Sequence, residues 1–130
     1  MIQTTLGKVY NAYVTINQIR NKVKGTDALH VFHLKNMLKE GVDFMAEEDA
    51  RLVADAGGMV TDNGMVIIAD KEKRSEYLNA RKNLDNQETE IQADPVVIMI
   101  DRCPDVTAEQ IEMVDGFVIF NEEVNDNGTE

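Results

Sequence analysis

The sequence has no tryptophan, one cysteine, two prolines and only seven aromatic residues among its 130 positions. A single cysteine excludes an intramolecular disulfide and fits a reducing compartment. With so few aromatic rings the core must be aliphatic, and the seven methionines can fill gaps between Leu, Ile and Val.

Long apolar runs are also missing. No stretch approaches the roughly 18 to 20 apolar residues that a membrane-spanning helix needs. The N-terminus, Met1 to Thr5, lacks the basic start and apolar segment of a signal peptide. We therefore expect a soluble protein with no membrane partner.

The length and composition predict one globular domain. A chain of 130 residues closes one core, and its 43% hydrophobic and 28% charged residues are ordinary for a globular protein. We place a single α+β domain over residues 1–120. Residues 121–130 are polar, carry four acids and are predicted to form a flexible acidic tail.

The net charge of −11 is unevenly distributed. Residues 1–40 hold six basic and two acidic residues, a balance of +4, whereas residues 41–130 hold seven basic and 22 acidic residues, a balance of −15. Such a field repels nucleic acid, so we expect no direct binding to it. The field favours a basic partner or self-association of the plus end with the minus end. Plain solubility explains the same charge without any partner.

The first half of the chain shows helical periodicity. Apolar residues recur at steps of three and four over residues 5–24 and again over residues 26–56, which predicts two helices. Gly25 between them can take the left-handed conformation that ends a helix, and Thr26 is the predicted N-cap of the second. So short a joint predicts an antiparallel helical hairpin, in which Gly41 marks either a bend or a close approach of the first helix.

A β-hairpin and a third helix should follow. Asn63-Gly64 lies between two β-prone runs, which predicts a tight turn with positive φ at both residues. Asp70 is placed to cap a helix over residues 71–85.

The last third of the chain predicts strands and one short helix. Alternation over residues 89–93 indicates an exposed strand, and the apolar run 96–100 indicates a buried one. Thr107 and Gln110 form a capping box that opens a short helix. The predicted fold is thus α+β: an antiparallel helical hairpin with a β-hairpin, a small antiparallel sheet and two further short helices.

Few residues suggest chemistry. His30 and His33 are three apart and would share a helical face, where Asp27 or Glu40 could complete a metal site, but two histidines alone are a weak signal and exposed surface histidines are the ordinary interpretation. Arg102 could lower the thiol pKa of Cys103, but we expect a buried or incidental thiol, because no phosphatase-like arginine follows and the histidines are far away in the sequence. We predict no catalytic residue, no cofactor and no metal, so the chain is not expected to be an enzyme.

Two clusters are candidates for an interaction surface. The acids Glu47, Glu48, Asp49 and Asp55 lie on the predicted second helix, where they form either a docking face or a solvated face. Phe117 and Phe120 bound an apolar run that either closes the core or pairs with another subunit.

Several segments together form a familiar pattern: residues 6–12, residues 47–53, Asp62-Asn63-Gly64, the run from Tyr77 to Ile91, and residues 106–111. In these segments the chain resembles a family of small proteins of unknown function from phages and prophages of Gram-positive bacteria. It departs from that pattern at Gly57-Gly58 and at the strand with Pro95. The resemblance implies a phage origin and a place in the host cytoplasm or the virion, and it supplies no catalytic residues.

Three functions follow as hypotheses. The first is a non-enzymatic interaction protein, a virion component or assembly factor, whose partner is a phage structural protein, a host factor or a second copy. The second is an acidic mimic of nucleic acid that inhibits a host nuclease or DNA-binding protein. The third, a small metal-dependent enzyme, has only His30, His33 and Cys103 in its favour.

Overall fold

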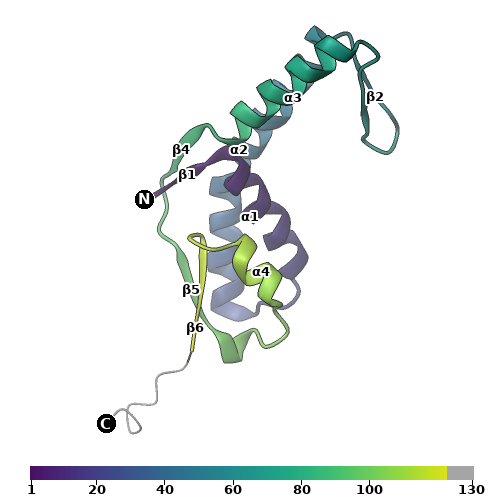
Figure 1. Ribbon diagram of the computed structural model, residues 1–130. Coiled ribbons are helices and arrows are strands. Elements are labelled where there is room, and N and C mark those ends of the chain that lie inside the picture. Colours follow the sequence, from purple (N-terminus) through teal and green to yellow (C-terminus); the bar gives the residue numbers. More distant parts are fainter. Residues whose placement is uncertain (123–130) are drawn as a thin grey trace, which may run out of the picture.

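The computed structural model describes residues 1–122 (Figure 1). Most of the predicted tail therefore lies outside the described residues, and Asn121 belongs to a strand. The chain runs through β1 (Ile2–Thr5), α1 (Leu6–Ile19), α2 (Gly25–Asp55), β2 (Met59–Val60), β3 (Val66–Ile67), α3 (Lys71–Asp85), β4 (Glu88–Ile91), β5 (Val96–Met99), a 3-10 turn (Ile100–Arg102), α4 (Ala108–Met113) and β6 (Val118–Asn121). The predicted α+β class is confirmed.

The helical hairpin is formed by α1 and the first half of α2, as predicted. A Cβ atom on Gly41 would lie 3.3 Å from Cγ1 of Val9, so the predicted close approach of the first helix is confirmed. The predicted boundaries were partly wrong. α1 ends at Ile19, five residues early, and the N-cap of α2 is Lys24 without a side-chain hydrogen bond, not Thr26. Gly25 has a φ of +57°, the left-handed conformation expected of it, but it begins α2.

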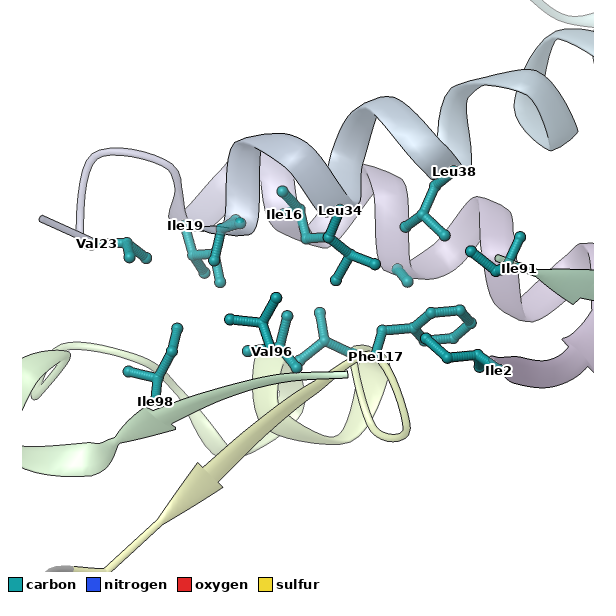
Figure 2. Packing of buried hydrophobic residues seen from close by; sticks show 14 of the residues in the cluster. Ile2, Ile16, Ile19, Val23, Leu34, Leu38, Ile91, Val96, Ile98 and Phe117 are labelled. Carbon is teal, nitrogen blue, oxygen red and sulfur yellow. The ribbon is translucent and has the colours of Figure 1, made fainter. Parts of the chain in front are cut away.

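The main core lies between this hairpin and the C-terminal segments. Figure 2 shows side chains of the two helices, among them Ile16 and Leu34, pointing toward a layer that contains Val96, Ile98 and Phe117. Phe117 is the only aromatic side chain among the fully buried ones in the described part of the chain. The aliphatic core that the composition predicts is therefore present.

The second half of α2 runs beyond this core and packs against α3 (Figure 1). A small separate cluster of Leu6, Met45 and Leu84 joins the helices there. Asp70 caps α3 as predicted, since its Oδ1 accepts a hydrogen bond from the Lys73 amide at 2.9 Å. The molecule is thus elongated, with the β2–β3 hairpin at the far end of the α2–α3 pair.

The β-hairpin occurs where it was predicted, but its turn is different. Only Gly64 has a positive φ, +86°, and no non-glycine residue within 1–122 does, so the predicted positive φ at Asn63 is wrong. The Thr61 amide donates a hydrogen bond of 2.8 Å to the Met65 carbonyl, and this bond closes a three-residue loop. Such a loop needs a single left-handed residue, which spares Asn63 the steric cost.

Two further pairs of strands complete the fold. β1 pairs antiparallel with β4, joining Ile2 to Ile91, and supplies an N-terminal strand that the sequence analysis missed. β5 and β6 pair in parallel, with Val96 opposite Val118, whereas only an antiparallel sheet was predicted. The chain between them crosses over through α4, which is the kind of connection a parallel pair requires. The predicted capping box of α4, between Thr107 and Gln110, is confirmed.

None of the helices within residues 1–122 combines the length and the apolar character that crossing a membrane requires.

Candidate interaction surface

The predicted acidic cluster is largely engaged within the chain. Nη2 of Arg51 lies 2.8 Å from Oε1 of Glu48, and Nη1 lies 3.4 Å from Oδ2 of Asp55. The hydrogen bond from Arg51 lowers the pKa of the Glu48 carboxyl. Glu47 is exposed. Glu47, Glu48 and Asp55 lie on one side of α2, but Glu48 and Asp55 form ion pairs with Arg51 of the same helix.

Asp49 joins two helices. The Tyr77 hydroxyl of α3 donates a hydrogen bond to its Oδ1 at 2.6 Å, and Nε of Arg81 lies 3.3 Å from the same oxygen. The pKa of Tyr77 is raised to about 12, mainly by burial and secondly by this hydrogen bond. Asp49 therefore has a structural role in holding α3 on α2.

The aromatic pair of the predicted surface is turned inward. Phe117 is 2% exposed and belongs to the main core, and Phe120 is half-buried and packs against that core. Of the two alternatives, closure of the core is the correct one for Phe117, and its place in an interaction surface is corrected accordingly. Strand alternation leaves Ile119 as the exposed apolar residue of β6.

The candidate residues for chemistry are dispersed. His30 and His33 are exposed on α2. Asp27, a candidate third ligand, has its Oδ1 atom 3.9 Å from Nη1 of Arg102. Within residues 1–122, no group of three or more His, Cys, Asp or Glu side chains is placed to hold a metal ion. Cys103 is fully buried, and burial raises its thiol pKa. Of the two interpretations of Cys103, the buried thiol is the correct one, and Arg102 faces Asp27.

The structure reveals a groove that the sequence analysis missed. Two cavities, of about 350 Å³ and about 460 Å³, lie between α2 and the chain segment 87–97, and both are lined by Met37. We call these two adjoining cavities together the α2 groove. Its α2 side is lined by His30, His33, Leu34, Met37, Glu40, Gly41 and Phe44, and its other side by residues that include Glu90, Ile91, Asp94, Pro95 and Val97.

The α2 groove combines exposed apolar side chains with acidic ones. Met37 is 43% exposed, Phe44 41% and Val97 52%. Glu40, Glu90 and Asp94 also line it, and no Lys or Arg of the described chain does. Asp94 additionally contacts the Met1 amino group at 3.2 Å. The groove therefore suits a ligand that is apolar in its middle and basic at its edges.

A sequence signal for half of this groove exists. Met37 and Phe44 are seven residues apart, two helical turns, so they share a face of α2, and neither lies on the stripe of Val31, Leu34 and Leu38 that enters the core. Apolar residues off the core stripe point to a second contact. The other wall comes from residues more than 40 positions away and has no such signal.

A third cavity of about 530 Å³ lies over the β1–β4 pair. Its lining is entirely polar, from Gln3 to Thr5 and from Glu88 to Glu90. Without an apolar residue it offers no anchor for a partner.

Comparison of the chain with protein-family models, with curated proteins and with solved structures found no match. The resemblance to phage proteins therefore remains a prediction, and the function must be argued from the surface.

Proposed function

We propose that this protein is a non-enzymatic interaction protein that holds an apolar segment of another protein in the α2 groove. The observation that carries the proposal is the exposure of Met37, Phe44 and Val97 along two adjoining cavities that have Met37 in common. Burying such side chains releases roughly 25 cal/mol for each Å² of apolar surface. They offer a partner an apolar centre within an acidic margin, which is the usual anatomy of a docking site.

The class of partner comes from the sequence resemblance. A phage or prophage protein that works through contacts is a virion component or an assembly factor, present in the host cytoplasm or in the virion. We accordingly propose a phage structural protein as the partner.

The arrangement of the acids supports docking over mimicry of nucleic acid. A mimic presents rows of free carboxylates to a basic site. Here Glu48 and Asp55 pair with Arg51, and Asp49 is held by Tyr77 and Arg81. The cluster most suited to imitate phosphates is thus partly neutralised.

The test is a tagged pull-down from phage-infected or prophage-induced cells, at low and moderate salt, with partners identified by mass spectrometry. Met37→Asp places a charge in the centre of the groove. Leu29→Asp is the matched control, because Leu29 is 52% exposed on the same helix and lines neither cavity. Circular dichroism checks that both variants fold.

We expect capsid or tail proteins to be captured at moderate salt by the wild type and by Leu29→Asp, and lost with Met37→Asp. Apolar contacts resist screening, so moderate salt should not release them. Capture that survives Met37→Asp would overturn the groove as the docking site. A host nuclease or DNA-binding protein that washes off as salt rises would replace the proposal with mimicry.

A further inference from the structure

The outer face of α3 carries an unusual pattern of side chains. Lys71, Ser75, Leu78 and Lys82 are spaced by four, three and four residues, so they lie along one side of the helix. The opposite side, with Tyr77, Ala80 and Leu84, faces α2. Leu78 is 58% exposed, so it is an apolar residue on the solvent-facing side of the helix.

The two lysines of this face are unpaired within the described chain. Lys71 and Lys82 form no ion pair with any residue of the described part, whereas Asp85, about 40° around from Lys71, is paired with Arg81, which also contacts Asp49. Glu72 and Glu76 lie on the flank of the helix, about 100° and 140° around from Lys71. The centre of the face is therefore a leucine between two lysines.

This face is complementary to the α2 groove. The groove offers Met37 and Phe44 for an apolar side chain and Glu40 and Glu90 for the lysines, and neither glutamate has an ion-pair partner within residues 1–122. The lengths also agree. At 1.5 Å per residue, Lys71 to Lys82 spans about 17 Å, and the wall of the groove from His30 to Phe44 spans about 21 Å.

A chain does not fill its own groove in this way, because its α3 packs on α2 at Met45 and Asp49, whereas the groove runs along residues 30–44 of α2. Donor face and acceptor groove are thus separate surfaces of one molecule. A contact between two different surfaces leaves one of each unused at the ends, so it propagates into rings or filaments.

We propose that the α2 groove binds the outer face of α3 from a second copy of this chain, and that the protein assembles head to tail. The inference rests on the groove being a docking site, as proposed above, and it names a second copy as an occupant. The lysines orient the helix toward Glu40 and Glu90, and Leu78 packs against Met37 and Phe44, which line the same cavity as the two glutamates.

The test measures association of the full chain by analytical ultracentrifugation over a range of concentrations, at low and high salt. The wild type should form dimers and larger species, fewer at high salt because the ion pairs are screened. Leu78→Asp on the donor face and Met37→Asp in the groove should each weaken association by about tenfold or more. Leu29→Asp should associate like the wild type.

Mixing the two defective variants is the decisive step. Leu78→Asp keeps an intact groove and Met37→Asp keeps an intact α3 face, so together they can form one contact. We expect a one-to-one dimer that grows no further. A matching exchange of charge, K71E with K82E mixed with E40K with E90K, should also restore dimers that neither variant forms alone.

A wild type that remains monomeric at every concentration, or a mixture that stays monomeric while both variants keep the wild-type circular dichroism, would overturn the head-to-tail assembly. These outcomes are separable from the proposed function. Loss of a phage partner on Met37→Asp with a monomeric wild type would leave docking intact and remove only the second copy as an occupant.

Discussion

Tyr77 and Asp49 form the only side-chain hydrogen bond between α2 and α3 in the described chain. The hydroxyl is partly shielded from water and donates to a carboxylate, so the neutral phenol is favoured and its pKa rises to about 12 from a usual 10.0. Tyr77 therefore holds its proton more tightly in the folded protein than in the unfolded chain.

This difference makes stability depend on pH in the alkaline range. A group with a raised folded pKa stabilises fully below its unfolded pKa, here 10.0, and its contribution is lost as pH rises through about 12. We expect Tyr77→Phe to cost about 1 kcal/mol at neutral pH and to lose less additional stability than the wild type between pH 10 and 12. Urea unfolding at several pH values measures both effects.

Tyr10→Phe serves as the control, because Tyr10 is 43% exposed and its hydroxyl makes no hydrogen bond within residues 1–122. A Tyr77→Phe variant with the same alkaline loss as wild type and control would contradict the role assigned to this hydroxyl.

Among the elements, the β2–β3 hairpin depends on a close approach at its base. A Cβ atom on Gly58 would lie 2.8 Å from Cγ1 of Ile68, 3.0 Å from the Ile67 carbonyl oxygen and 3.2 Å from Cγ1 of Val53. The absence of a side chain at Gly58 thus lets the hairpin fold back onto the end of α2.

We expect Gly58→Ala to destabilise the protein by about 1–3 kcal/mol, because a backbone oxygen cannot move aside as a side chain can. Gly57→Asn is the comparison: Gly57 has a φ of +68° with nothing within 4 Å, and Asn tolerates that conformation. Thermal unfolding of both variants measures the difference. Equal stability of Gly58→Ala and the wild type would show that the hairpin is not seated as described.

At the scale of the whole molecule, the packing is unequal along α2. The near half belongs to a core of sixteen buried residues, while the far half joins a second cluster of only three, Leu6, Met45 and Leu84, and buries Val53 near its end. Both strands of the β2–β3 hairpin are exposed or half-buried. Less buried apolar surface means a smaller free energy of local opening.

The rates of amide hydrogen exchange should therefore differ between the two ends of the molecule. We expect amides of α3 and the β2–β3 hairpin to exchange at least about tenfold faster than those of α1 and the first half of α2. Exchange measured by mass spectrometry on peptides from each region tests this directly. Uniform protection throughout α2 and α3 would indicate one cooperative unit.

The sequence by itself determined the helices, the caps at Asp70 and Thr107, the site of the hairpin and the aliphatic core. Each depends on residues within a few positions of one another, or on composition, so periodicity and capping rules reach them. The tertiary structure alone decided the pairing of Ile2 with Ile91, the parallel β5–β6 pair, the partners of Asp49 and the α2 groove. These features join segments separated by tens of residues, and their formation depends on how the chain packs as a whole, which leaves no local pattern in the sequence.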